Sequence, residues 1–199
     1  MAHKIPKVIV LIESSREAGR GLLRGIARYS RIFGPWTFYR IPPFYYEKFS
    51  GRKKSMPHPR DWGADGIIMR DTEQTETIMN MNIPVILSRA IKNIDPRYSC
   101  VIADCQGTGR MAAEYFIDRG FTNFAFGGFE NMPWSTERYQ SFAKKITEAG
   151  YQTATYTPPQ GSRLSWADEQ KQIADWLRSL PKPVGLMASN DDRGQDIME

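Results

Sequence analysis

The stretch VIADCQGTGRMAAEYFIDRGFTNFAFGGFENMPWSTER, residues 101–138, decides the fold of this chain. It opens with a short apolar run, after which Asp104 stands where a helix N-terminus needs a capping oxygen. Gly120 stands where that helix would end, because glycine tolerates a positive φ angle. A second apolar run follows at residues 123–127, and the next helix is expected to carry Arg138 near its start. The order strand, helix, strand, helix predicts βαβ units in a parallel sheet.

The pattern Gly107-x-Gly109-x-x-Ala112 allows two explanations. It could be the glycine fingerprint of a dinucleotide site, or it could belong to the joint between two lobes of a ligand-binding protein. A dinucleotide site needs its first glycine at the end of the strand, so that the pyrophosphate reaches the helix N-terminus. Here Asp104 intervenes, and its negative charge would repel pyrophosphate. The pattern therefore favours the joint between lobes, with a nucleotide-dependent enzyme as an alternative.

Strand-like and helix-like segments alternate on both sides of this stretch, and the connections are short apart from an irregular segment at residues 42–60. Strands are expected at residues 7–12, 36–41, 66–69, 84–87, 100–103, 123–127, 152–156 and 184–188. Such alternation predicts an α/β fold in which parallel sheets are flanked by helices. Because the alternation ends near Gly120 and restarts at Asn123, we expect an N-terminal lobe at residues 1–121 and a C-terminal lobe at residues 122–199. The second lobe would be incomplete, since no strand follows its last helix, and we expect the chain to be truncated.

The helix expected at residues 17–32 has two unusual features. Gly19, Gly21 and Gly25 each reduce its intrinsic propensity by up to about 1 kcal/mol, which suggests close packing against the sheet or against another chain. Arginines run along or beside another face, at Arg16, Arg20, Arg24, Arg28 and Arg31. The helix is therefore a candidate surface for a homodimer, although solvated charge explains the arginines nearly as well.

Composition and charge argue against several classes of function. No apolar stretch reaches the ~18 residues of a membrane span, and no secretory signal precedes the first strand, so we expect a cytoplasmic protein without membrane contact. With only two histidines and two cysteines, we expect no metal site, no cofactor and no enzymatic activity. The net charge is +5, and its densest basic cluster, residues 52–54, is expected to be a solvated loop rather than a nucleic-acid surface.

Polar side chains gather where the expected strands end, which is the edge where open α/β sheets bind ligands. The candidate ligand-binding residues are Ser14, Arg16, Arg70, Asp71, Trp134, Arg138 and Asn190. Arginine forks and carboxylates pair with vicinal hydroxyls, and an aromatic ring covers an apolar face, so this set suits a sugar-like polyol.

Several of these candidates also have a purely structural explanation. Arg16 could be one more charge on the arginine-rich helix, and Asp71 could cap the helix that follows it. Trp134 could be a hydrophobic staple at a helix start. Asn190 is an obvious helix cap. The residues alone leave both explanations open at these positions.

Several motifs resemble the core of the lac-repressor and periplasmic-sugar-binding-protein family. They are Asp104 with Ala112 eight residues on, GFTNFAFG at residues 120–127, Arg138, and Ser189-Asn190-Asp191. More narrowly, SSREAGRGLLRGIARYSRIFGPWTFYR, WSTERYQSF and IADWLRSLPKPVGLMASNDDRGQDIME resemble xylose-operon regulators. Those proteins carry an N-terminal sugar-sensing core and an AraC-type helix-turn-helix domain at the C-terminus, a DNA-binding domain that is absent from this chain.

The resemblance implies a two-lobe, periplasmic-binding-protein-like fold and a bacterial transcriptional regulator. Its sugar effector, a pentose such as xylose, would bind between the lobes and control how the missing domain meets operator DNA. Arg138 matches the arginine that grips sugar hydroxyls in the family, and Asn190 matches an asparagine at the end of a second-lobe strand. Arg70, Asp71 and the turn at residues 14–16 match first-lobe contact regions. A sugar-binding component of a transport system is the alternative, and the missing signal peptide argues against it.

Overall fold

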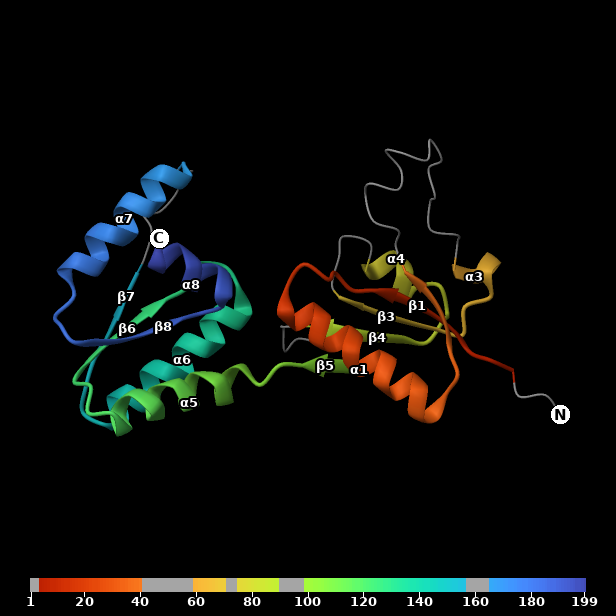
Figure 1. Ribbon diagram of the computed structural model, residues 1–199, viewed down its shortest axis with the longest axis horizontal. Helices are drawn as coiled ribbons and strands as arrows, with labels where there is room; N and C mark the ends of the chain where they lie inside the picture. The colour runs from red at the N-terminus through yellow and green to blue at the C-terminus, as the bar shows by residue number, and fades with distance from the viewer. Residues whose placement is uncertain (1–3, 41–58, 71–74, 90–98, 157–164) are drawn as a thin grey trace. The chain divides into compact units, whose positions relative to one another are not determined.

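The computed structural model describes residues 4–40, 59–70, 75–89, 99–156 and 165–199. These form two compact units, Met1–Ile102 and Ala103–Glu199 (Figure 1). Most of the irregular segment expected at residues 42–60, and the candidate site residue Asp71, lie outside the described residues.

The first unit contains a five-stranded parallel sheet with the strand order β2-β1-β3-β4-β5. Its strands are β1 (Lys7–Leu11), β2 (Thr37–Arg40), β3 (Gly66–Arg70), β4 (Val85–Arg89) and β5 (Ser99–Ile102). Its described helices are α1 (Glu17–Phe33), α3 (Pro59–Trp62) and α4 (Thr75–Met79). Since β1 lies between β2 and β3, the strand order reverses beside the turn after β1. Doubly wound sheets bind ligands at such a reversal.

Both faces of the first sheet are apolar where helices cover them. On one face Val8, Val10 and Ile12 pack against α1 through side chains such as Leu22 and Ile26. On the other face the core is formed by Ile9, Ile67, Met69 and Leu87 together with Ile78 of α4. Central strands buried on both faces are what the continuous apolar run at residues 7–12 predicts.

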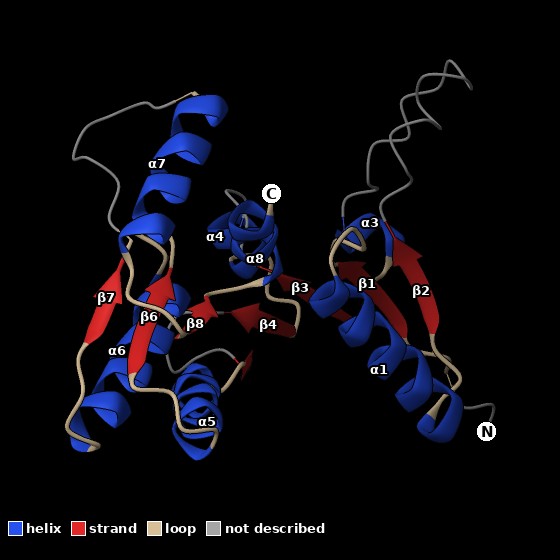
Figure 2. Cartoon of the chain, turned by 60° about the vertical axis from the view of Figure 1, so that its left-hand side comes forward, coloured by secondary structure: helices blue, strands red, loops and turns tan. Residues whose placement is uncertain are grey.

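The second unit contains a three-stranded parallel sheet with the order β7-β6-β8. The strands are β6 (Asn123–Gly127), β7 (Thr153–Thr155) and β8 (Val184–Ala188), and the helices are α5 (Cys105–Asp118), α6 (Pro133–Glu148), α7 (Trp166–Ser179) and α8 (Asp191–Met198). Helices α5 and α6 lie on one side of this sheet, and α7 and α8 lie on the other (Figures 1 and 2). The core between the sheet and α5 and α6 contains Phe124, Phe126, Phe142 and Ile146. The predicted α/β architecture with helix-flanked parallel sheets is therefore confirmed.

The boundary between the units differs from the prediction at residue 121. It falls between Ile102 and Ala103, because α5 packs along α6 and belongs to the second unit. A β-carbon on Gly109 of α5 would lie 2.3 Å from the carbonyl oxygen of Arg138 in α6, so the two helices touch backbone to backbone. The predicted boundary assigned α5 to the same lobe as the preceding strand, β5. In the structure, α5 packs against the following helix, α6.

Capping and packing account for the glycines that resemble a dinucleotide fingerprint. The Asp104 carboxylate accepts a hydrogen bond of 2.7 Å from the backbone N–H of Gly107 and so caps α5. Gly109 provides the close approach to α6, and Gly120 ends the helix turn with a φ of 76°. The structure therefore uses these residues to cap, pack and end α5.

Two alanine substitutions test whether the close contact at Gly109 matters for stability. One places a methyl group against neighbouring backbone, and the other places it where it meets no close contact. Gly109→Ala places a methyl group against the α6 backbone, and we expect a loss of about 2 kcal/mol in the free energy of unfolding. Gly194→Ala lies in α8, where the new β-carbon would stand 3.8 Å from the β-carbon of Ala188, an ordinary van der Waals contact. There the higher helix propensity of alanine should add about 0.5–1 kcal/mol. Urea unfolding followed by circular dichroism measures both values, and equal effects would contradict the α5–α6 contact.

Candidate functional site

In the first unit, Glu13 organises the turn between β1 and α1. One oxygen of its carboxylate accepts hydrogen bonds from the backbone N–H groups of Ser15 (3.0 Å) and Arg16 (3.3 Å), and from the Ser15 hydroxyl. The bond from the Ser15 hydroxyl is the largest of the effects that lower the pKa of Glu13. The other oxygen lies 3.2 Å from Nη1 of Arg70. A single carboxylate therefore joins the end of β1 to the end of the neighbouring strand β3.

This arrangement brings three of the predicted first-lobe residues to one edge of the sheet. Ser14 and Arg16 lie exposed in the turn, and Arg70 reaches the same turn through its ion pair with Glu13. Glu13 itself is a structural centre that the set of predicted site residues lacked. Its position directly after an apolar strand, with serines following, was the available signal.

In the second unit, Arg138 is held at the end of the neighbouring strand. Its Nη1 donates a hydrogen bond to the carbonyl oxygen of Ser189, directly after β8. Its guanidinium carbon lies 5.3 Å from the centroid of a Trp134 ring, within the range of a cation–π contact. The Nε of Arg138 and the hydroxyl of Ser189 are buried and have no hydrogen-bond partner among the described residues. The guanidinium of Arg138 is thus fixed in place, and its Nε–H group donates no hydrogen bond to the described residues.

A second arginine, Arg193, lies in the first turn of α8 and is only 3% exposed. Its Nη1 lies 3.0 Å from a carboxylate oxygen of Glu169 on α7 and 3.3 Å from one of Asp196. Its guanidinium carbon stands 4.1 Å from the centroid of the Phe129 ring, in the loop after β6. The Phe129 ring in turn meets Trp134 nearly edge-on, with 6.1 Å between centroids.

These contacts form a continuous series that we call the arginine–aromatic ladder: Arg193, Phe129, Trp134 and Arg138. It crosses from α8 to the start of α6 and ends on Ser189 at the end of β8. Two ladder residues, Trp134 and Arg138, were predicted from the sequence as site residues. Their convergence at the carboxyl edge of the sheet is a geometric finding that the sequence left open.

Asn190 is the N-cap of α8. Its side-chain oxygen accepts a 3.0 Å hydrogen bond from the backbone N–H of Arg193, and its amide nitrogen donates to Asp192 at 3.1 Å. The structural explanation of Asn190 is therefore correct. The cap also places this residue next to Ser189, beside the end of the ladder.

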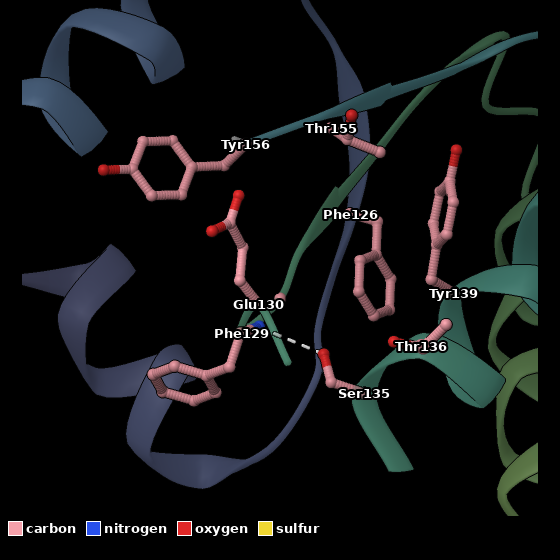
Figure 3. A pocket seen from close by; sticks show the side chains of 9 residues that line it. Phe126, Phe129, Glu130, Ser135, Thr136, Tyr139, Thr155 and Tyr156 are labelled. Atoms are coloured by element: carbon pink, nitrogen blue, oxygen red, sulfur yellow. Dashed lines mark hydrogen bonds between the residues drawn. The ribbon is translucent and has the colours of Figure 1, made fainter. Parts of the chain in front are cut away.

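A cavity of about 200 Å³ opens beside the ladder, over the ends of β6 and β7 (Figure 3). Its lining consists of Phe126, Gly128, Phe129, Glu130, Ser135, Thr136, Tyr139, Thr155 and Tyr156. The Ser135 hydroxyl accepts a 3.0 Å hydrogen bond from the backbone N–H of Phe129 and so holds the loop against α6. Burial is the main cause that raises the pKa of Tyr156. Hydroxyls, one carboxylate and aromatic walls are the groups that suit a small polyol.

Sequence reasoning missed Phe129, Ser189 and Arg193 as members of this arrangement. The sequence pattern around Arg193 is unusual. Negative side chains are favoured in the first turn of a helix, as at Asp191 and Asp192, whereas the positive charge of Arg193 opposes the helix dipole. No sequence pattern indicates Phe129, since its role depends on its contacts with the Arg193 guanidinium and the Trp134 ring, which the fold creates.

The described residues contain no group of histidine, cysteine and acidic side chains that could hold a metal ion. None of their helices has the length and apolar character needed to cross a bilayer.

Comparison with known proteins first defines the class of fold. Residues 113–199 match the family model of the periplasmic binding protein-like domain. The structure of the xylose-binding transcription activator xylR superposes with a TM-score of 0.78 at 22% identity, covering 99% of this chain and 50% of that one. A periplasmic binding protein/LacI transcriptional regulator from Alkaliphilus metalliredigens, complexed with D-xylulofuranose, gives a TM-score of 0.63 at 16% identity, covering 98% and 71%. The chain therefore has a periplasmic-binding-protein-like fold.

Among curated proteins, the chain is similar over its whole length to xylose operon regulatory proteins. It is 24% identical to the one from Haemophilus influenzae and 23% identical to the one from Escherichia coli K12, of which it covers 52% and 51%. The chain thus spans about half the length of the curated relatives it matches. These relatives are named as regulators, which agrees with the prediction that the chain is not an enzyme.

Proposed function

We propose that this chain is the sugar-sensing region of a cytoplasmic bacterial transcriptional regulator, and that its effector is a pentose such as xylose. The observation that carries the proposal is the anchored guanidinium of Arg138, held on Ser189 and stacked on Trp134 at the carboxyl edge of the second sheet. Donors that are fixed before binding lose little freedom when a ligand arrives. The whole-length similarity to xylose operon regulatory proteins supports the choice of ligand class.

Each unit would contribute one side of the contact. In the second unit, Arg138 would donate to adjacent sugar hydroxyls while Trp134 covers the apolar face of the sugar. The side-chain oxygen of Asn190 already accepts the hydrogen bond that caps α8, so Asn190 would offer the sugar only its remaining donor and acceptor positions. In the first unit, the turn that carries Ser14 and Arg16 would supply polar groups together with Arg70 and Asp71.

Regulation would follow from a shift between arrangements of the two units. A sugar that binds one arrangement more tightly than another shifts the population towards it, and the shift can change the DNA affinity of a linked domain. We propose that this domain is an AraC-type helix-turn-helix that follows the sugar-sensing region and binds operator DNA. The proposal involves no metal and no cofactor.

Arg138→Ala tests the sugar contact. Hydrogen bonds from a charged donor contribute about 1.5–3 kcal/mol each, so we expect D-xylose affinity measured by calorimetry to fall at least about tenfold. Arg178→Ala is the matched control, because Arg178 is an exposed arginine of the same unit that pairs with Asp175 on its own helix. An unchanged affinity in Arg138→Ala, or a wild-type response to NAD and to no sugar, would contradict the proposal.

We also propose that the protein forms a homodimer through the flank of α1. An apolar groove of about 640 Å³ runs between this flank and the sheet, lined by residues that include Gly21, Gly25, Ile86 and Val101. Ile86 and Val101 are 41% and 53% exposed, and a parallel sheet normally has both faces covered. Gly21 and Gly25 would let the same helix of a second copy approach closely. Sedimentation velocity should show a dimer that Gly25→Glu converts to a monomer, and a wild-type monomer at every concentration would contradict this.

A further inference from the structure

The position of Arg193 is poorly explained by stability alone. A buried charge must be compensated, and a cation at a helix N-terminus opposes the helix dipole. Its Nε is buried without a hydrogen-bond partner among the described residues, which adds a further cost. Apolar side chains of similar size often replace buried ion pairs without loss of stability. A role beyond stability would explain why an arginine occupies this position.

The groups that Arg193 contacts are parts of the candidate site. Its guanidinium stacks on Phe129 at 4.1 Å and lies 5.7 Å from the ring centroid of Tyr156, and both rings line the cavity over β6 and β7 (Figure 3). Through Phe129 it supports Trp134. Its backbone N–H binds the side chain of Asn190. The side chain of Arg193 therefore underlies the ladder and one wall of the cavity, and the backbone of the same residue binds the cap of α8.

We propose that Arg193 is the positioning residue of the sugar site, an inference that rests on the proposed function. It does not touch the sugar. The carboxylates of Glu169 and Asp196 fix its guanidinium, whose flat face then sets the positions of Phe129 and Tyr156. Phe129 passes this constraint to Trp134, on which the sugar-binding guanidinium of Arg138 rests.

Lysine should not replace arginine in this role. A guanidinium is planar, so it can stack on a ring while its edge pairs with carboxylates, whereas an ammonium is a compact point charge. Arg193→Lys therefore preserves the charge and the pairing with Glu169 but loses the flat surface. This difference separates positioning from simple charge compensation.

The first test needs no ligand and uses the whole chain labelled with 5-fluorotryptophan. The chain has five tryptophans, and Trp134→Phe identifies the Trp134 fluorine resonance. We expect this resonance to shift in Arg193→Lys and in Phe129→Leu, which keeps the ion pairs and removes only the bridging ring. Trp36 and Trp62, in the other unit, should not respond. Arg178→Lys, an exposed control on α7, should leave all resonances in place.

The second test measures D-xylose affinity of the same variants by calorimetry. We expect about a tenfold loss in Arg193→Lys and Phe129→Leu and none in Arg178→Lys. A folded Arg193→Lys and Phe129→Leu with an unmoved Trp134 resonance, or with wild-type affinity, would overturn the positioning role. A wild-type protein that binds no pentose would overturn the proposed function alone, since the fluorine measurement is independent of sugar.

Discussion

The buried guanidinium of Arg193 is the interaction on which the carboxyl end of the second sheet depends. It draws together side chains from α7, α8, the loop after β6 and the end of β7. These segments are far apart in the sequence, and apolar contacts such as the one between the Tyr156 and Trp176 rings also join them. Because Arg193 is buried, removing its carboxylate partners would leave a buried charge uncompensated. Under the proposed positioning role, the loop that carries Phe129 would in turn position Trp134 and Arg138.

The two units organise the carboxyl edges of their sheets with charges of opposite sign and unequal burial. In the second unit the organising group is a buried cation, whereas in the first it is the partly exposed carboxylate of Glu13. An exposed ion pair such as Glu13–Arg70 contributes on the order of 1 kcal/mol or less. The turn in the first unit is therefore held mainly by the three hydrogen bonds that Glu13 accepts from Ser15 and Arg16.

The sequence predicted the architecture well because periodicity is a local property. The strands at residues 123–127 and 184–188 have the expected bounds, and the Asp104 cap and the Gly120 turn are present. The boundary of the compact units falls before α5 and not at residue 121, because the packing of α5 on α6 depends on the backbone approach at Gly109, which strand and helix patterns do not reveal. The candidate site was predicted in part. Trp134, Arg138 and Asn190 could be placed at strand ends, whereas Phe129 and Arg193 matter only through contacts that the fold creates.

We propose that the carboxyl edge of the second sheet binds the sugar. This can be measured by titrating the ¹⁵N-labelled chain with D-xylose and following the backbone amide chemical shifts. The largest changes should fall on residues 128–138 and 189–193, and they should disappear in Arg138→Ala. Changes concentrated at the opposite edge of the same sheet, around the Gly120 and Gly150 turns, would contradict the account.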